Sequence, residues 1–341
     1  MNYRQLGRSG LRVSQLCLGT MNFGGPTDGP TSLALMGAAW DAGITFIDTA
    51  DIYTGGDSER LVGQFLAGRR DQAVLATKAR NPVGPGVYDQ GSSRKHLRLA
   101  LEASLRRLGT DYIDLYYLHR PDDDCPLEES LAVLDEFVRA GKVLYLGVSN
   151  FWAWQVAWAQ GLTVRAGQSP LACIQPLYNL ANRDAEVELL PMARELGLGV
   201  ISYSPVARGV LSGQYAAGAV PPGSRRARGD GRLAETEWRP ANLDLAEAVA
   251  PLAAAAGCPP AQFALAWVLA NPNITAPIIG PRTQAHLDDY LAALQVKLPA
   301  DTEAHIDVLV PPGTRSGGKL DDPLYPITGR DPSRAAASVL T

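Results

Sequence analysis

The sequence predicts an α/β fold, a (β/α)8 barrel, and two observations lead to this prediction. Short β-like runs alternate with amphipathic helical segments along most of the 341 residues, and such alternation implies parallel strands joined by crossover helices. Eight of these β-like runs are present, which favours a closed barrel. An open doubly wound sheet is the alternative, but the sequence lacks the G-x-G-x-x-G turn of a dinucleotide-binding sheet.

The expected elements follow one another in a regular order. An N-terminal β-hairpin comes first, with runs at 4–6 and 11–16 on either side of a Gly-Arg-Ser-Gly turn. Amphipathic helices are expected at 32–43, 92–109 and 127–142, because the first ends on glycine, the second opens on serine and the third closes with glycine and lysine. The expected barrel strands are 15–19, 44–48, 73–78, 112–119, 143–150, 171–175, 198–204 and 275–280.

Three segments depart from the plain repeat. Residues 214–238 are rich in Gly, Pro and Arg, 243–272 contain an extra helical pair, and the Pro and Gly content of the tail, 311–341, argues against a regular element. Long irregular segments in a compact fold are either mobile and solvated or functional lids, and both readings stay open here. We expect one barrel domain over 1–341, with its core at about 12–294.

The composition excludes several classes of partner. A hydrophobic content of 46%, a charged content of 19% and a formal net charge of −4 are ordinary for a globular protein. The basic residues are dispersed, so we expect neither nucleic acid nor a membrane surface as a partner. The four cysteines are far apart and are expected to be core thiols in a reducing compartment. Because the N-terminus has no long apolar segment and no window is long enough to span a bilayer, we expect a cytoplasmic protein.

Polar residues stand at the carboxyl ends of the expected strands. A parallel barrel brings all these ends to one face, where catalytic side chains gather. Any one of the four ionisable residues alone would be interpreted as a cap or a core residue, but together, from consecutive strands, they indicate a functional site. In strand order the residues are Gly19, Thr20 and Met21; Asp48 and Tyr53; Lys78; His119; Ser149 and Asn150; Gln175; and Tyr203 and Ser204.

Three kinds of chemistry suit Tyr, Lys, Asp and His at one barrel mouth. A metal site of Asp48, Asp51 and His119 leaves the lysine unexplained, because an ammonium repels a cation. A Schiff base on Lys78 gives the tyrosine little to do. Proton transfer by Tyr53 uses all four residues and is the favoured interpretation.

Tyr53 needs help to exchange a proton near neutrality, because a free phenol has a pKa of about 10. A Lys78 ammonium about 4 Å away supplies up to ~4 kcal/mol at an effective dielectric constant of about 20, so a pKa lowered by about two units is within reach after desolvation. Asp48 would hold Lys78 charged, and His119 would donate to, or orient, a carbonyl oxygen.

A phenol beside a carbonyl group also needs a hydride donor, and no side chain provides one. A nicotinamide cofactor is therefore implied. Ser149, Asn150 and Gln175 suit its carboxamide, because an amide presents both a donor and an acceptor. Tyr203 could stack on the other face of the nicotinamide ring.

The chain closely resembles the aldo-keto reductases at these strand ends and between them. The matching stretches run in family order to about residue 294: LGTMNFG, FIDTADIY, LATK, DLYYLHRPD, LGVSNF, IQPLYN, YSPVARGVLSG and PIIGPRTQAHLDDYLAAL. The resemblance implies a (β/α)8 barrel that binds NADP(H) in extended form at its C-terminal mouth and interconverts aldehydes or ketones with alcohols. It also implies the catalytic tetrad Asp48, Tyr53, Lys78 and His119, with Tyr53 as general acid in reduction and as base in the reverse reaction.

The resemblance further implies cofactor contacts, with residues 214–238 as a flap. Many relatives have Gln and then Glu-Asn where this chain has His286 and then Asp289-Tyr290. Arg282 remains a candidate for the 2′-phosphate, because its fork suits phosphate oxygens, and NADP is favoured over NAD. The implied contacts are Gly19, Thr20, Met21 and Asp48 at the nicotinamide end; Ser149, Asn150, Gln175 and Tyr203 around the ring; Ser204, Pro205, Val206 and Gly209 along the pyrophosphate; and Gly280, Arg282, His286, Asp289 and Tyr290 at the adenosine end.

Aromatic side chains at a barrel mouth can form the walls of a carbonyl pocket. The candidates are Phe23, Tyr88, Trp152 and Trp238, together with the tail. Trp154 and Trp158, spaced i and i+4, are expected instead to pack a helix on the barrel. The physiological carbonyl or alcohol substrate and the oligomeric state, a homo-oligomer included, are left open.

Two other functions compete with the reductase. A cofactor-binding regulatory subunit of the same fold would turn over slowly, and the intact tetrad argues against it. A metal-dependent barrel hydrolase would lose activity on chelation, and we expect no metal. Oxidation of NADPH with a panel of carbonyl compounds separates the enzyme from the regulatory subunit.

Overall fold

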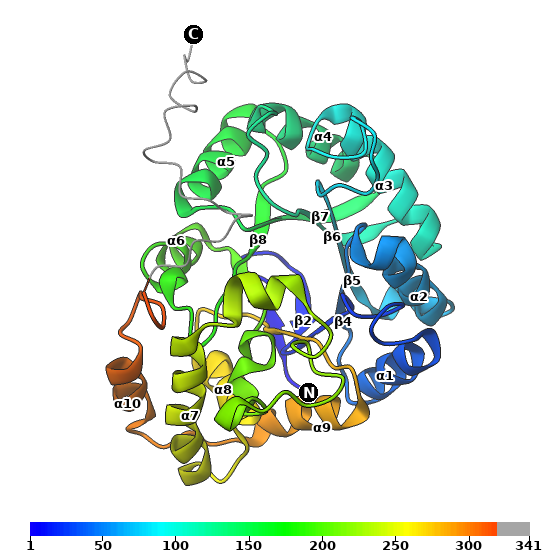
Figure 1. The fold of residues 1–341 in the computed structure, drawn as a ribbon. Coiled ribbons are helices and arrows are strands. Elements are labelled where there is room, and N and C mark those ends of the chain that lie inside the picture. Colours follow the sequence, from blue (N-terminus) through cyan, green and yellow to red (C-terminus); the bar gives the residue numbers. More distant parts are fainter. Residues whose placement is uncertain (319–341) are drawn as a thin grey trace.

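Eight parallel strands form one curled sheet in the computed structural model, which describes residues 1–318 (Figure 1). The strand order is β10-β3-β4-β5-β6-β7-β8-β9. Backbone N–H groups of Thr275 and Ile278 donate to the carbonyls of Val200 and Ser202, at 2.8 and 2.7 Å, and join the two ends of the sheet. The predicted (β/α)8 barrel is therefore confirmed.

The barrel strands are short, and the last two are shorter than expected. The expected strands at 198–204 and 275–280 shrink to two residues each, because after Val200 the chain leaves the ladder, and Tyr203 pairs only through a single bridge with Leu177. The strands are β3 (Cys17–Gly19), β4 (Phe46–Asp48), β5 (Val74–Ala79), β6 (Ile113–Leu118), β7 (Val143–Ser149), β8 (Leu171–Gln175), β9 (Gly199–Val200) and β10 (Ile278–Ile279).

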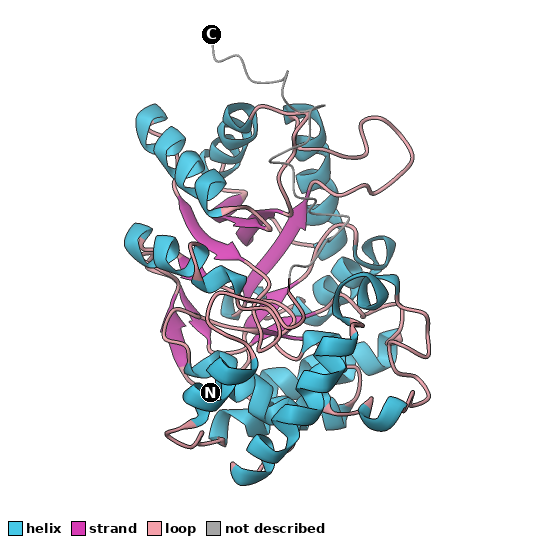
Figure 2. Ribbon diagram, turned by 60° about the vertical axis from the view of Figure 1, so that its left-hand side comes forward, coloured by secondary structure: helices cyan, strands magenta, loops and turns pink. Residues whose placement is uncertain are grey.

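Helices surround the strands on the outside of the barrel (Figure 2). Helix α3 begins where the Ser93 hydroxyl accepts the N–H of His96, and it ends at Gly109, whose φ of 62° is favourable for glycine. The helices are α1 (Gly29–Asp41), α2 (Asp57–Leu66), α3 (Arg94–Leu108), α4 (Leu127–Arg139), α5 (Ala153–Ala166), α6 (Leu189–Leu196), α7 (Pro240–Ala255), α8 (Pro260–Ala270), α9 (Gln284–Ala292) and α10 (Thr302–Leu309).

Helices α7 and α8 are the expected extra pair. Within residues 1–318 no single helix is long and apolar enough to cross a membrane, and these two reach that length and hydropathy only together, across an 84° bend. The segment 214–238 consists of turns, with a 3₁₀ turn at Ala216–Gly218 and a π-helical turn at Leu233–Glu237. The tail is irregular over 311–318, and its remainder, 319–341, lies outside the described residues.

The hairpin of β1 (Tyr3–Gln5) and β2 (Arg12–Ser14) closes the N-terminal end of the barrel. The backbone N–H of Arg8 donates to the carbonyl of Gly197, two residues before β9, at 2.8 Å. Two hairpin residues, Leu6 and Val13, pack with inward-facing strand residues in an interior cluster. This cluster consists of Leu6, Val13, Cys17, Phe46, Val74, Ala76, Leu115, Tyr117, Cys173, Ile201 and Ala276.

Strand alternation separates this interior from a second apolar layer under the helices. Val74 and Ala76 of β5 lie in the interior cluster, whereas Leu75 and Ala79 belong to the outer cluster. Lys78 therefore shares the inward face of β5. All four cysteines are free thiols.

The predicted packing of Trp154 and Trp158 is wrong. Both side chains are exposed, by 66% and 43% of their surface. The face of α5 that packs on the barrel is instead occupied by small and aliphatic residues. The buried residues of this helix are Ala153, Val156, Ala159, Leu162 and Thr163.

Gly63→Ala should destabilise the fold, because a Cβ on Gly63 in α2 would lie 2.4 Å from the carbonyl oxygen of Leu108, at the end of α3. We expect a loss of about 1–3 kcal/mol of unfolding free energy, measured by urea denaturation. Gly37→Ala in α1 is the matched control, because nothing lies within 4 Å of its added Cβ. That control should gain up to about 1 kcal/mol from helix propensity, and equal effects of the two variants would contradict the prediction.

Candidate active site

The strand ends carry the four predicted catalytic side chains. Asp48 follows the inward-facing Phe46 by two residues in β4, and Lys78 follows Ala76 in the same way in β5. His119 comes one residue after the end of β6. Tyr53 begins a 3₁₀ turn, Tyr53–Gly56, on the loop that leaves β4.

Lys78 is the centre of the site, and its side chain is fully buried. Its ammonium donates to Oδ1 of Asp48 in a short ion pair and to the carbonyl of Thr49 at 2.8 Å. The same Nζ lies 3.4 Å from the Tyr53 hydroxyl, within hydrogen-bond distance. The structure therefore contains the lysine–phenol contact on which the predicted chemistry depends.

The predicted carboxamide partners belong to the same network. Gln175 Nε2 donates to Oδ2 of Asp48 at 2.9 Å, and the Ser149 hydroxyl donates to the carbonyl of Gln175 at 2.9 Å. Asn150 Nδ2 donates to the carbonyl of His119 at 3.0 Å. These bonds join the ends of four strands into one polar unit.

Burial decides the acidity of Tyr53. Burial raises the pKa of the phenol above its ordinary value of 10.0; the Lys78 ammonium lowers it and Asp48 raises it again, so the pKa remains raised. The Lys78 ammonium acts in the expected direction, but the expected net lowering of this pKa does not occur in this structure, because burial is the largest effect and Asp48 adds to the rise. Tyr53 therefore holds its proton at neutral pH.

Lys78 and His119 differ in charge. Burial lowers the pKa of Lys78, but Asp48 and Tyr53 outweigh that effect and raise it above its usual value. For His119, burial and then the Lys78 ammonium hold the pKa well below 6.5. The imidazole is therefore neutral, and its ring lies edge-on to Tyr53 with ring centres 6.0 Å apart. A neutral ring can still donate one hydrogen bond.

Backbone strain is concentrated at this mouth. A left-handed φ in a residue other than glycine costs about 1–3 kcal/mol unless its surroundings hold it. At Asn150 the Tyr203 hydroxyl provides such support by donating to Oδ1 at 2.8 Å. The residues in 1–318 with this conformation are Thr54, Arg80, Asn150, Ser204, Ala207, Arg208 and Ala217, and all but the last lie in loops that leave the strand ends.

Asp51 is a buried carboxyl outside the tetrad network. Among residues 1–318 no side chain donates a hydrogen bond to either of its oxygens. Burial, with a smaller effect from Glu59 and opposed by Arg107, raises the pKa of Asp51 to about 8. The buried Tyr116 hydroxyl has no hydrogen-bond partner in the described part of the chain, and burial and then the charge of Asp51 raise its pKa. In the described part of the chain no three His, Cys, Asp or Glu residues are placed to hold a metal ion.

The residues predicted for the nicotinamide end have mixed exposure. The Thr20 side chain is buried and donates to the carbonyl of Asp48 at 3.1 Å. Met21 is exposed. Gly19 lets β3 approach β10 closely, because a Cβ there would lie 2.5 Å from the Ile278 side chain.

The segment expected to bind the pyrophosphate follows β9. Pro205 and Val206 are buried, and Ser204 is partly buried with a φ of 57°. Gly209 has a φ of 96°, and its carbonyl accepts from Gln214 Nε2 at 3.1 Å. The segment is thus a tight, strained turn rather than an extended strand.

Near the residues expected at the adenosine end, two guanidinium groups meet. Arg282 Nη1 and Arg228 Nη1 both donate to the carbonyl of Gly223, at 2.7 and 3.0 Å. Fork-shaped cationic donors of this kind fit the phosphates of a dinucleotide. Gly280 leaves open space beside its Cα, since an added Cβ would meet only Asn22, at 4.0 Å.

The neighbouring residues of α9 have other contacts. His286 Nδ1 accepts the backbone N–H of Arg282 at 3.4 Å, and burial lowers the pKa of this histidine. Asp289 accepts from Gln262 Nε2 at 2.9 Å. Tyr290 packs against the core, and burial raises its pKa to about 12.

The four aromatic residues predicted for the substrate pocket are dispersed. Phe23 is buried in the outer core cluster, and Trp238 lies edge-on to Tyr215 with ring centres 4.9 Å apart. Tyr88 and Trp152 are exposed. Within residues 1–318, no ring contact joins any of the four to Tyr53 or His119. The tail that was expected to contribute lies mostly outside the described residues.

Two arginines near the tetrad were missed by the sequence reasoning. The charge of Arg80 contributes to the lowered pKa of His119, and the charge of Arg208 acts to lower the pKa of Tyr53. Arg80 follows Lys78 by two residues, and Arg208 lies inside the SPVARG stretch, so their positions were the available signal.

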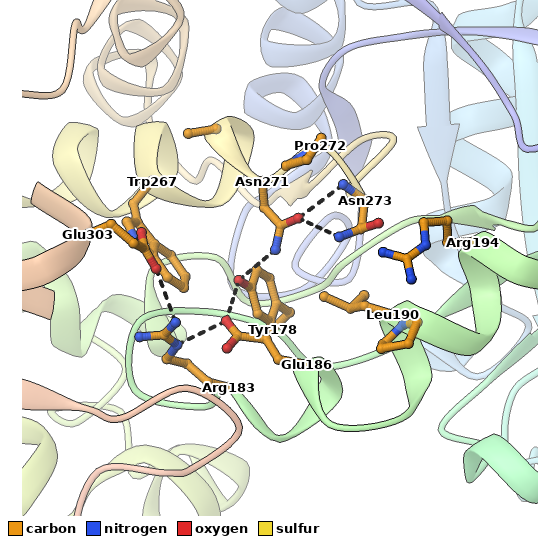
Figure 3. A pocket seen from close by; sticks show the side chains of 12 residues that line it. Tyr178, Arg183, Glu186, Leu190, Arg194, Trp267, Asn271, Pro272, Asn273 and Glu303 are labelled. Carbon is orange, nitrogen blue, oxygen red and sulfur yellow. Dashed lines mark hydrogen bonds and ion pairs between the residues drawn. The ribbon is translucent and has the colours of Figure 1, made fainter. Parts of the chain in front are cut away.

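A cavity of about 440 Å³ lies elsewhere, between the loop after β8 and helices α6, α8 and α10 (Figure 3). None of the predicted site residues lines it. Its polar groups pair with one another: Tyr178 and Arg183 both donate to Glu186, at 2.8 and 2.9 Å, and Trp267 donates to Glu303 at 2.8 Å. The last of these bonds attaches α10 to α8.

Known proteins are similar in sequence to this chain over most of its length. The sequence model of the Aldo/keto reductase family matches residues 15–310. The chain is 43% identical to the uncharacterised oxidoreductase YrpG of Bacillus subtilis (strain 168), over 87% of this chain and 92% of the relative. It is 38% identical to a probable voltage-gated potassium channel subunit beta of Oryza sativa subsp. japonica, with the same coverage. It is 35% identical to L-glyceraldehyde 3-phosphate reductase of Escherichia coli (strain K12), over 86% of this chain and 88% of the relative.

The family match and the relatives named as oxidoreductases support an oxidoreductase with a (β/α)8 barrel. With the family match over nearly the whole chain, the protein belongs to the Aldo/keto reductase family.

Asp51→Asn should flatten the pH dependence of stability. Between the ordinary pKa of about 3.9 and the folded value of about 8, the folded state keeps a proton that the unfolded chain has lost. Stability from this group is therefore greatest at low pH and falls as the pH rises toward 8, by at most about 1.4 kcal/mol per unit. The variant should gain on the wild type between about pH 6 and about pH 8 in urea denaturation.

Asp111→Asn is the matched control, because this side chain is exposed just before β6. It should follow the wild-type pH dependence. A constant difference between wild type and Asp51→Asn across this pH range would show that Asp51 is ionised in the folded protein.

Proposed function

We propose that this protein is an NADP(H)-dependent carbonyl reductase with Tyr53 as its general acid, and as general base in the reverse reaction. One observation carries the proposal: the buried Lys78 ammonium, paired with Asp48, lies 3.4 Å from the Tyr53 hydroxyl. An ammonium at that position stabilises the phenolate that remains after proton transfer.

When bound, the reduced nicotinamide supplies the hydride that adds to the carbonyl carbon. Tyr53 gives its proton to the carbonyl oxygen, and neutral His119 donates a hydrogen bond to the same oxygen. Lys78 stabilises the phenolate until a proton from solvent restores the phenol. Because burial raises the pKa of Tyr53, the resting side chain already carries the proton that reduction requires.

The chain's own residues would hold the cofactor at the mouth. Gln175, Ser149 and Asn150 lie together beside Asp48 and suit the carboxamide. Arg282 would bind the 2′-phosphate and so favour NADP over NAD. A cytoplasmic location is part of the proposal, because the four free thiols suit a reducing compartment.

A second candidate function comes from a relative. The Oryza sativa protein is named as a potassium channel subunit, so a cofactor-binding regulatory subunit with little turnover is the alternative. The complete tetrad, with its lysine–phenol contact, supports the enzyme instead. The Escherichia coli relative is named as a reductase of an aldehyde phosphate, which supports a small carbonyl substrate.

Tyr53→Phe should lower kcat for carbonyl reduction by at least about 100-fold, because it removes the transferable proton. Cofactor affinity, measured by fluorescence titration, should change little. Tyr112→Phe is the matched control, because Tyr112 lies just before β6, at the opposite end of the barrel. Near-normal turnover of Tyr53→Phe would remove Tyr53 from the mechanism, and a wild type that binds NADPH tightly but reduces no carbonyl compound would favour the regulatory subunit.

Arg282→Ala should weaken NADPH binding by about 10- to 100-fold and leave NADH binding nearly unchanged, because only NADPH carries the 2′-phosphate. The dissociation constants can be measured by fluorescence titration. Arg12→Ala, an exposed residue of the N-terminal hairpin, is the control for loss of one positive charge. An equal loss of affinity for NADPH and NADH would mean that Arg282 binds a part of the cofactor that both molecules share.

A further inference from the structure

Helix α5 presents an apolar face to solvent. The helix lies on the outside of the barrel, between α4 and α6 (Figure 1). Trp154 and Trp158 are exposed by 66% and 43%, and Val164, further along the same helix, is exposed by 78%. Large apolar side chains that gather on one exposed face mark an interaction surface.

The exposed residues of α5 recur with the spacing of a single helix face. Counted from Trp154, they stand at i, i+3, i+4, i+7, i+10 and i+11, which places them in one line along the helix. We call this set the α5 stripe. It consists of Trp154, Ala157, Trp158, Gly161, Val164 and Arg165.

The α5 stripe carries little charge. Arg165 is the only charged residue of this helix. The helices on either side have charged outer residues, such as Arg139 of α4 and Glu195 of α6, whose side chains are 67% and 76% exposed. A partner for the stripe is therefore expected to be apolar as well.

The order of large and small residues makes the α5 stripe complementary to itself. Trp154 and Gly161 are equally distant, in opposite directions, from the point midway between Ala157 and Trp158. If two copies of α5 pack antiparallel about a two-fold axis at that point, residue i of one copy meets residue j of the other and the reverse. Trp154 then lies opposite Gly161, and Trp158 opposite Ala157. The space beside Gly161 is open, because an added Cβ would meet nothing within 4 Å.

The exposed area suits a dimer of modest affinity. A tryptophan side chain offers up to about 250 Å², so Trp154, Trp158 and Val164 together expose on the order of 400 Å² in each copy. A standard interface buries about 800 Å² per partner. The rest of the stripe adds to this area, as does Trp152, which is 49% exposed at the start of α5. Tryptophan is also enriched among the residues that contribute most to binding.

We propose that the α5 stripe is the interface of a two-fold dimer of this chain, in which the two α5 helices run antiparallel and Trp154 of each copy lies opposite Gly161 of the other. A membrane surface is a poorer fit, because helices that lie on membranes are rich in Lys and Arg, whereas α5 has Arg165 alone. Since α5 begins just after the carboxyl end of β7, the two barrel mouths would face in opposite directions and remain open. The inference is independent of the proposed reductase function.

The experiment measures the mass of the full chain by sedimentation velocity between about 1 and about 100 µM protein. The wild type should change from monomer to dimer across this range, as expected for an interface at the small end of the size range. Trp154→Ala should raise the dissociation constant of the dimer by at least about 100-fold, because each dimer loses two rings. Leu99→Ala in α3 is the matched control, because Leu99 is also a large exposed apolar residue, and this variant should dimerise like the wild type.

Position 161 tests the register. Gly161→Trp should prevent dimerisation, because two rings would then lie opposite each other. The folded monomer should be at least as stable to urea as the wild type, since tryptophan has a higher helix propensity than glycine and the added side chain has open space. The double variant Trp154→Ala with Gly161→Trp again places a ring opposite a small residue. Its dissociation constant should return to within about 10-fold of the wild-type value.

The contrary outcomes are distinct. A wild type that stays monomeric at about 100 µM would overturn the inference, and binding of that monomer to phosphatidylglycerol vesicles would assign the stripe to a membrane surface instead. A dimer that persists in both Trp154→Ala and Gly161→Trp would place the interface elsewhere on the molecule. A double variant that is folded but monomeric would overturn the antiparallel register. None of these measurements depends on turnover, so a failure of the reductase proposal would be seen separately.

Discussion

One buried ammonium organises the mouth of this barrel. Lys78 gives up all its water, and three oxygen atoms replace that water, from Asp48, Thr49 and Tyr53. Removing a partner from a buried ion pair of this kind typically costs about 3–5 kcal/mol, since a charge is then left unpaired. The register of the sheet makes the pairing possible, because Asp48 stands opposite Ala76, and Lys78 is the next inward residue of β5. Fold and candidate chemistry therefore depend on the same contact.

The barrel and the convergence of Asp48, Tyr53, Lys78 and His119 could be predicted from the sequence, because alternation along a strand and parallel pairing leave little freedom for strand-end residues. The acidity of Tyr53 could not, because its direction depends on the balance between burial and two opposite charges. The exposure of Trp154 also could not be predicted from the sequence pattern. An i, i+4 aromatic pair fits either face of a helix, and small residues such as Ala153 and Ala159 take the inner face.

In this molecule the strands form a rigid wall, and the strained residues lie in the loops beyond the strand ends. The interior cluster is filled to the point where β7 needs glycine at position 147, since a Cβ there would lie 2.6 Å from the Tyr117 ring. The left-handed residues, such as Arg80 and Arg208, instead lie beyond the strand ends. A stable wall can hold such conformations without collapsing, so unusual side-chain positions become available where a ligand enters.

The way in which the sheet closes links ligand binding to the local stability of the barrel. The two edge strands of the sheet, β9 and β10, are not joined by a continuous ladder. Instead, the N–H groups of Thr275, Ala276 and Ile278 donate to carbonyls in and just after β9. Regions with few backbone hydrogen bonds open more easily in local fluctuations, so we expect this seam to open more readily than the continuous strand pairs. The turn after β9 and the turn after β10 begin on opposite sides of this seam, so a molecule that contacts both turns would hold the seam closed. The binding free energy of that molecule would then be measurable as slower amide hydrogen exchange along the seam.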